Sequence, residues 1–241
     1  MLDALQLEIA AVGNTVSIRA RHPRESGVRF VWEEKNQVNL TYQITVPRQC
    51  QVDLATRTGN ITVGNLTGQV QARTETGNIF CRRIDGAVEA RTDFGNVTVS
   101  HCTGAAVVRV LQGTIRIGPI GGRAELKNST GDIEVQAARA GITALAEVGD
   151  VSVGFPRTFT GEADIRTAGG NIFATIDPAA NCTVRASTVW GRVDCALALT
   201  VESGASGKSK LTGRLNQGGP VLKLHASGGR VKISAAATGR E

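Results

Sequence analysis

The sequence predicts an all-β fold, a single-domain β-solenoid of about 18-residue, two-strand coils with an N-terminal β cap. Three observations predict it. Glycine recurs every 18 residues, each of these glycines precedes Asn, Asp or Thr and then Ile or Val, and only 4% of the 241 residues are aromatic. A fixed period near 20 residues is typical of stacked repeats, and small, branched side chains suit a narrow coil. The repeat glycines are Gly59, Gly77, Gly95, Gly113, Gly131 and Gly149.

The first 50 residues lack the glycine period but contain strand-like runs. Alternation of apolar and polar residues is the period of a half-buried strand, and Pro47 ends the last run. Because the open end of a solenoid is a sheet edge that must be covered, we expect residues 1–50 to cap the coil. The expected strands are 5–9, 16–20, 28–32 and 38–46.

Residues 51–234 are expected to form the repeats. Strand side chains alternate between the two faces, so the apolar positions of each repeat should point into the space between two sheets. Glycine followed by Asn or Asp suits a turn with positive φ. Members of the inward set include Ile61, Val63, Leu66, Ile79, Cys81, Ile84, Val97, Val99 and Cys102 in the first half-repeat, and Val70, Ala72, Thr74, Thr76, Val88, Ala90, Thr92, Phe94, Ala106, Val108 and Val110 in the second.

Beyond Gly149 the period lengthens to 21 residues, at Gly170 and then Gly191. The extra residues coincide with 155–157 and 177–178, which we interpret as turn insertions. Arg192 occupies the turn position that Asn or Asp holds elsewhere. We expect a mobile loop over the small, glycine-rich residues 202–220, a last coil over 221–234 that closes the domain, and a tail at 235–241.

The net charge of +6 and the pI near 9.4 indicate an acidic partner, such as a polysaccharide or a membrane surface. The alternative is an excess of surface charge that only keeps the protein soluble. Nothing indicates nucleic acid specifically. The five cysteines form no CxxC pair and have no histidine at metal-ligand spacing, which argues against zinc and a disulfide framework. A Cys182–Cys195 bridge is the one pairing left open.

One outward column of the repeat is basic. Its members are Arg73, Arg91, Arg109, Lys127 and Arg166, here called the basic stripe. Stacked at about one strand spacing, they would form a positive surface for an acidic polymer or membrane. The alternative is an ordinary solvated face, since acidic residues lie two positions away. Arginine at these positions also excludes the calcium sites of a β-roll with nine-residue repeats.

No catalytic, cofactor-binding or metal-binding set stands out. The three histidines are scattered, no carboxylate pair recurs as an acid and base, and the glycines never open a helix as a phosphate loop does. Thr56, Thr58, Thr74, Thr76 and Thr92 suggest an ice-binding threonine ladder, but alternation should turn them inward. The sequence therefore predicts a protein that is not an enzyme and uses no cofactor.

The runs Thr58-Gly59-Asn60-Ile61-Thr62-Val63 and Thr130-Gly131-Asp132-Ile133-Glu134-Val135 resemble the bacterial adhesin-type β-helix family, a set of domains of unknown function. The lead-in 42–47 and the closing 218–233 are similar to that family too. The resemblance implies a β-solenoid exported to the envelope or cell surface and supplies no catalytic residues. The first residues lack the basic start and apolar core of a secretory signal, so we expect either an intracellular protein or one whose leader has been removed.

The leading functional hypothesis is a non-enzymatic structural or adhesion module of the envelope that binds through a broad surface. The alternative is a cytoplasmic, bactofilin-like scaffold that forms homo-oligomers end to end through its coil ends. A groove-based polysaccharide-active enzyme is the third hypothesis.

Overall fold

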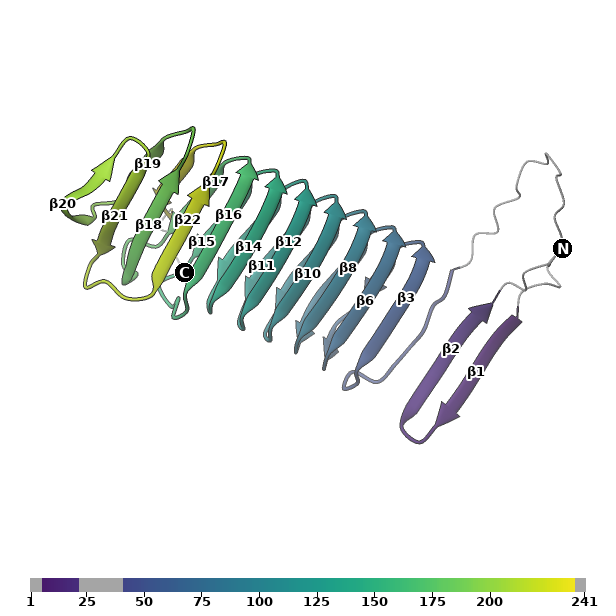
Figure 1. Cartoon of the computed structure of the whole chain (residues 1–241). Helices are drawn as coiled ribbons and strands as arrows, with labels where there is room; N and C mark the ends of the chain where they lie inside the picture. The colour runs from purple at the N-terminus through teal and green to yellow at the C-terminus, as the bar shows by residue number, and fades with distance from the viewer. Residues whose placement is uncertain (1–5, 22–40, 237–241) are drawn as a thin grey trace, which may run out of the picture. The chain divides into compact units, whose positions relative to one another are not determined.

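The computed structural model describes residues 6–21 and 41–236. The chain divides into two compact units, Met1–Ile44 and Thr45–Glu241. Every regular element in the two described ranges is a β-strand. The second unit is the β-solenoid that the glycine period predicts (Figure 1).

The first unit contains a hairpin of β1 (Gln6–Val12) and β2 (Thr15–Arg21), which pair antiparallel. Gly13, with φ of 57°, lies in its turn. These strands confirm the ones expected at 5–9 and 16–20. The strand expected at 28–32 and the start of the one at 38–46 lie outside the described residues, and the assignment of residues 1–50 as a cap stays a prediction.

Residues 41–46 form no strand, so the expected strand at 38–46 is wrong over that part. Tyr42, Ile44 and Val46 alternate with polar residues as predicted, but all three are exposed. Alternation produces a strand only where a neighbouring strand takes up the backbone hydrogen bonds, and no ladder of the described residues includes 41–46.

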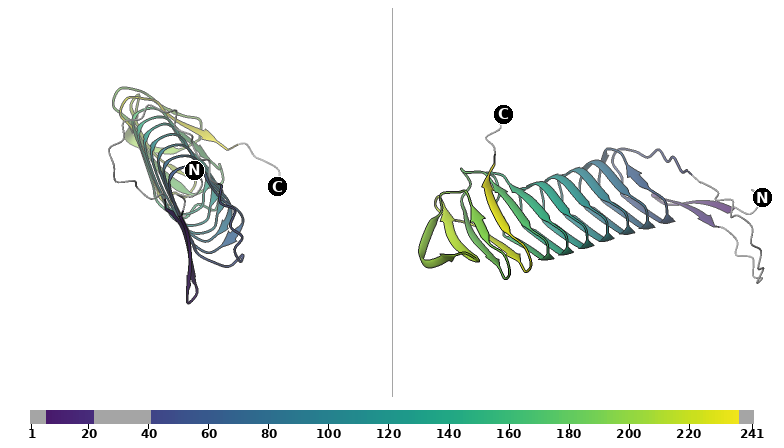
Figure 2. Two further views of the ribbon diagram at one scale, coloured as in Figure 1. Left: turned by 90° about the vertical axis from the view of Figure 1, so that its right-hand side faces the viewer. Right: turned by 90° about the horizontal axis from the view of Figure 1, so that it is seen from above.

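Two sheets form the solenoid, and their strands are parallel except for β20 and β21 at one end of sheet 1 (Figures 1 and 2). Successive coils add strands to both sheets. Sheet 1 has the order β20 (Thr200–Gly207), β21 (Lys210–Leu215), β18 (Cys182–Thr188), β22 (Val221–Ala226), β16 (Ala163–Gly169), β14 (Ile142–Val148), β12 (Ala124–Thr130), β10 (Ala106–Gln112), β8 (Val88–Phe94), β6 (Val70–Thr76) and β3 (Val52–Thr58). Sheet 2 has the order β19 (Val193–Cys195), β23 (Val231–Ala235), β17 (Ile172–Ile176), β15 (Val151–Phe155), β13 (Ile133–Ala138), β11 (Ile115–Ile120), β9 (Val97–Cys102), β7 (Ile79–Asp85) and β4 (Ile61–Val63), with β5 (Leu66–Thr67) also on β7.

The register of both sheets follows the 18-residue period. Ile79 lies opposite Val97 and Ile115 opposite Ile133, so equivalent positions of successive coils form columns. The inward columns are buried and fill the space between the sheets with branched side chains. Within the predicted inward set, the exceptions are Thr58, Thr76 and Phe94, because all three are exposed at the end of their strands. Alternation ends there because the chain is already turning toward the next repeat glycine.

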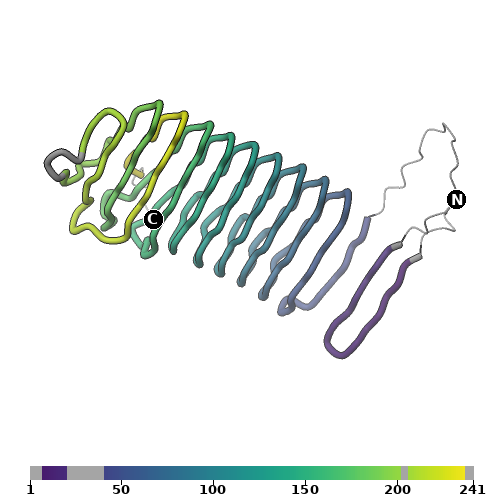
Figure 3. The backbone as a smooth tube through the Cα atoms, viewed as in Figure 1, coloured from purple at the N-terminus to yellow at the C-terminus, as the bar shows by residue number. Residues whose placement is uncertain are grey.

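The turns between the sheets stack as closely as the strands do (Figure 3). Gly95 has φ of 148°, and a Cβ built there would overlap the backbone carbonyl of Gly77 in the preceding coil. Only glycine tolerates both the conformation and the approach. The following Asn forms a second ladder, in which Asn78 Oδ1 accepts the backbone N–H of Asn96 at 2.8 Å and Asn96 Oδ1 accepts that of Thr114 at 2.8 Å.

A polar column inside the coil supports the same turns. Thr74 Oγ1 donates to the carbonyl of Gly59 at 3.2 Å, and Thr92 Oγ1 donates to that of Gly77 at 3.0 Å. Both threonines are buried. This confirms that these two residues point inward, so they cannot belong to an exposed ice-binding ladder, and it explains why a hydroxyl is tolerated in the core.

The C-terminal coils do not stack in chain order. β22 lies between β16 and β18 (Figure 1), and β23 lies between β17 and β19. The expectation that 221–234 closes the domain is therefore wrong. β21 pairs antiparallel with β18 and β20 pairs antiparallel with β21, so 202–220, expected to be a loop, is mostly strand. Its backbone hydrogen bonds go to the edge that β18 would otherwise expose.

Candidate binding surfaces

The basic stripe lies on the outer face of sheet 1, in one register. Arg73 lies opposite Arg91, Arg91 opposite Arg109 and Arg109 opposite Lys127. Leu145 follows, and Arg166 comes next to it on β16. The structure thus brings the first four predicted cations together on neighbouring strands and leaves the fifth one strand further away.

Acidic neighbours pair with every member of the stripe. The nitrogen-to-oxygen distances are 3.6 Å for Arg73–Glu89, 3.7 Å for Arg91–Asp93, 3.5 Å for Arg109–Glu125, 3.0 Å for Lys127–Glu125 and 2.8 Å for Arg166–Asp164. The hydrogen bond and charge of Lys127 lower the pKa of Glu125. These pairs are exposed, so each contributes little to stability, but together they neutralise much of the positive field.

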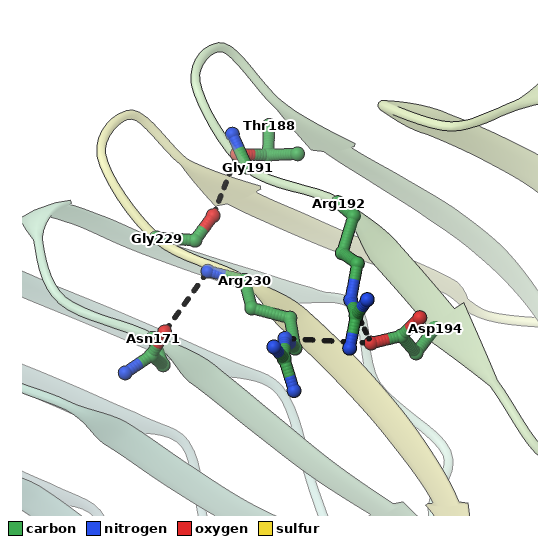
Figure 4. A network of polar contacts seen from close by, with 7 residues as sticks. All are labelled: Asn171, Thr188, Gly191, Arg192, Asp194, Gly229 and Arg230. Atoms are coloured by element: carbon green, nitrogen blue, oxygen red, sulfur yellow. Dashed lines mark hydrogen bonds and ion pairs between the residues drawn. The ribbon is translucent and has the colours of Figure 1, made fainter.

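A second cationic group lies on the turn between the sheets, near the C-terminal coils (Figure 4). Arg192 and Arg230 are neighbours because Val193 lies opposite Val231. Arg192 Nε lies 3.0 Å from Asp194 Oδ2, and Arg230 Nε lies 3.5 Å from the same oxygen. The two guanidinium groups therefore share one carboxylate.

A shallow cavity of about 680 Å³ adjoins this pair. Its lining is Asn171, Phe173, Gly191, Arg192, Gly228, Gly229 and Arg230. The sequence marked Arg192 as a departure from the Asn/Asp pattern but not Arg230. Gly229-Arg230-Val231 repeats Gly191-Arg192-Val193, so the shared tripeptide was a usable signal. Their contact was not predictable, because it depends on the insertion of β23 beside β19.

A further open groove, of about 520 Å³, runs over the outer face of sheet 2. Arg116 and Glu134 lie within it and pair at 3.1 Å between Arg116 Nε and Glu134 Oε2. Gly118 is also part of the lining, and a Cβ there would overlap the backbone of Ser100. The two charged side chains of the groove compensate each other, which leaves it without a surplus of charge.

Within the described part of the chain, a single serine–histidine hydrogen bond is present, and it lies on the outer face of sheet 1. Ser187 Oγ and His225 Nδ1 are 2.9 Å apart, on β18 and β22. On its other side His225 lies opposite Arg166, and no carboxylate in the described part of the chain hydrogen bonds to it. Nucleophilic catalysis needs an oriented base and a pocket for the substrate. The pair is explained as a cross-strand hydrogen bond.

All five cysteines are free, including Cys182 and Cys195, so the bridge left open by the sequence does not form. Burial raises the pKa of Cys81 to about 12, with a further contribution from nearby Cys102, and burial raises the pKa of Cys182 to about 11. These thiols are protonated at neutral pH and behave as small apolar side chains. Among the described residues, no group of three His, Cys, Asp or Glu could hold a metal ion. No helix in those ranges has the length and apolar character to span a membrane.

This architecture is also that of a known protein family. The family model Toastrack DUF4097, a domain of unknown function, matches residues 11–234, which is most of the chain. No curated protein and no solved structure matches the chain. The matched family indicates no catalytic activity, and its β-solenoid is the fold described above. The chain belongs to the Toastrack DUF4097 family.

Proposed function

We propose that this solenoid is a non-enzymatic structural or adhesion module of the cell envelope, and that it binds an acidic polysaccharide through the outer face of sheet 1. The observation that carries the proposal is the register of the basic stripe, which places Arg73, Arg91, Arg109 and Lys127 on adjacent strands. A linear polyanion can contact such a column along its length and gains affinity from several weak contacts at once.

The ion pairs of the stripe are compatible with this function. Each pair is solvent-exposed; the Arg73 and Glu89 side chains, for example, are 48% and 37% exposed. An exposed pair contributes about 0–1 kcal/mol, so a carboxylate of the polymer can replace the protein's own carboxylate at small cost. Binding of this kind weakens as salt rises, because salt screens exposed charges.

The end-to-end scaffold is the second hypothesis, and the edges of sheet 1 argue against it. β3 is the terminal strand at one end, but the other end carries the antiparallel strands β21 and β20. A head-to-tail polymer of stacked parallel coils needs two matching open ends. The hairpin removes the match at the C-terminal coils.

The test compares oligogalacturonate, a neutral galactose oligomer of equal length, and vesicles containing anionic lipid. The variant is Arg73→Glu, Arg91→Glu and Arg109→Glu combined, and we expect it to lose oligogalacturonate binding at low salt. The matched control is Arg82→Glu, Arg83→Glu and Arg116→Glu, which makes the same charge change on sheet 2.

If the two triple variants lose oligogalacturonate binding equally, the polymer is attracted by net charge and not by the basic stripe. If the first triple variant binds as the wild type does, the basic stripe is not the binding site. Binding to the vesicles but not the oligosaccharide would replace the polysaccharide by a membrane surface. Saturable turnover of any small substrate would overturn the non-enzymatic assignment. Light scattering across protein concentration tests the scaffold, which requires filaments.

A further inference from the structure

The ladder of Asn and Asp side chains along the turns ends at two arginines. Asp150 Oδ1 accepts the backbone N–H of Asn171 at 2.7 Å, and Asn171 Oδ1 accepts that of Arg230 at 3.0 Å. The next positions in the column are Arg230 and then Arg192. Arginine has no oxygen with which to accept the next N–H. The column therefore gives up the hydrogen bond that an asparagine at position 230 would accept from the N–H of Arg192.

Two adjacent arginines in a column that otherwise holds Asn, Asp or Thr are a local departure of the kind found at functional sites. The turn itself does not require arginine. Gly191 and Gly229 keep the stacked glycine geometry, and Thr188 Oγ1 donates to the carbonyl of Gly229 at 2.7 Å as the other inward threonines do (Figure 4). The backbone of this turn is thus supported as in the other coils. The turn does not depend on the arginine side chains, so these are available for a function other than folding.

The charge around the pair is not balanced. Both guanidinium groups approach the same oxygen, Asp194 Oδ2, and Lys232 lies opposite Asp194 on β23. Two guanidinium groups thus share this carboxylate, and a third cationic residue lies at the paired position of the neighbouring strand. Both arginines face Asp194 through Nε, and their side chains are 59% and 48% exposed. Terminal nitrogens of two neighbouring guanidinium groups match the geometry of a carboxylate or phosphate.

The surroundings are suited to a sugar that carries such a group. The cavity beside the arginines is open, and Phe173 and Asn171 are among the residues that line it. Trp190, directly before Gly191, is 85% exposed. An indole this exposed contributes little to folding. Phe173 lines the same cavity as the two arginines, and aromatic rings beside arginine are common centres of binding energy.

We propose that Arg192 and Arg230 form a discrete binding site for the carboxylate or phosphate of an anionic glycan, with Phe173 and Trp190 contacting the sugar. The site lies on the turn between the sheets and is separate from the basic stripe on the face of sheet 1. This proposal deepens the proposed function and rests on it for the glycan, whereas anion binding by the arginine pair stands without it.

The test uses Arg192→Asn combined with Arg230→Asn in the full chain. Asparagine is the residue that the ladder uses elsewhere, so the double variant should fold and be at least as stable as the wild type, which thermal unfolding checks. We expect calorimetry with oligogalacturonate, and with an oligomer of glycerol phosphate, to show an affinity at least about tenfold lower for whichever polymer the wild type binds. The polymer that binds shows whether the site recognises a carboxylate or a phosphate.

Two controls separate this site from the stripe. Arg116→Asn removes an arginine that has a carboxylate partner of its own, and we expect less than a twofold change. The triple stripe variant should keep binding of a short trimer of the same sugar while losing that of a long polymer. A double variant that binds the trimer as tightly as the wild type would overturn the arginine site, and a stripe variant that loses the trimer would assign the binding to the stripe instead.

Discussion

From Gly77 to Gly149, the repeat glycines occupy positions in which backbone conformation and packing both exclude a side chain. Gly95 has φ of 148° and lies against the Gly77 carbonyl, and Gly77 meets Gly59 in the same manner. Gly64 is different, because a Cβ there would meet nothing within 4 Å. Glycine therefore recurs every 18 residues because each coil has one position where a side chain would collide with the preceding coil. Other glycines, such as Gly64, do not have this role.

We expect Gly95→Ala to lower the free energy of unfolding by about 2–4 kcal/mol, because alanine is strained at this φ and its methyl group displaces the adjacent coil. Urea unfolding measures the change. Gly64→Ala serves as the control and should alter stability by less than about 0.5 kcal/mol. Similar losses at the two positions would contradict the steric explanation.

The buried thiols make stability depend on alkaline pH. The pKa of Cys81 is about 12 in the folded chain against 9.0 for an unperturbed thiol, so the unfolded chain loses this proton first. The stabilising contribution is complete below about pH 9 and is lost as the pH rises toward the folded pKa. We expect this thiol to account for about 2 kcal/mol of lost stability between about pH 8 and about pH 10.5.

The measurement is urea unfolding of wild type and Cys81→Ala at both pH values. The substitution has its own cost at about pH 8, since it removes a buried sulfur, so the informative quantity is the difference in slope with pH. A variant whose stability falls as steeply as that of the wild type would show that Cys81 is not the titrating group.

At the scale of elements, β21 protects the end of sheet 1. It pairs with β18 along its length, and Leu215 is buried at 4% exposure beside the inward face of the last coil. β20 then covers β21, with a register irregularity between Val201 and Ser206. A short irregular antiparallel edge is a poor template for another chain, whereas a regular parallel edge is a good one.

We expect Leu215→Ser to detach β21 and expose the edge of β18, so that the protein associates with itself as its concentration rises. Size-exclusion chromatography with light scattering detects this. Leu111→Ser removes a leucine that is 49% exposed and should leave the protein unchanged. If the Leu215 variant keeps the mass of the wild type at every concentration, β21 does not protect the edge.

At the scale of the solenoid unit, each coil contacts only its neighbours, so stability is close to a sum of coil and interface contributions. Leu126 on β12 is fully buried between neighbouring coils, whereas Leu54 on the terminal β3 is only partly buried against the core. The same substitution should therefore have different costs in the middle and at the end.

We expect Leu126→Ala to lower the free energy of unfolding by about 3 kcal/mol and Leu54→Ala by about 1 kcal/mol. The coils around Leu126 cannot collapse into the cavity that the substitution leaves, whereas the partly buried Leu54 side chain has fewer contacts to lose. Chemical unfolding gives both values, and hydrogen exchange should show β3 opening before β12. Equal costs would mean that the unit unfolds as a globular core and not as stacked coils.

Much of this solenoid was predictable because its determinants are local and repeat. The glycine positions predict the turns, and alternation predicts the burial of residues such as Ile79 and Val97. It failed at Phe94, where the strand bends into a turn, and at 41–46, where alternation has no neighbouring ladder. The basic stripe was likewise predictable in its placement, since one register relates its first four members. Its acidic neighbours two positions away, such as Asp93, were also visible in the sequence, whereas the pairs that cross strands, such as Arg73 with Glu89, were not.

The sequence by itself determined the coil, its period, its inward residues and the glycine turns, because each depends on a residue and its equivalents 18 positions away. Only the tertiary structure decided the order of the last coils, the antiparallel cover on β18 and the meeting of Arg192 with Arg230. The physical reason is that coils sharing one register can stack in more than one order. The choice between orders lies in packing and edge hydrogen bonds between distant segments, which periodicity does not encode.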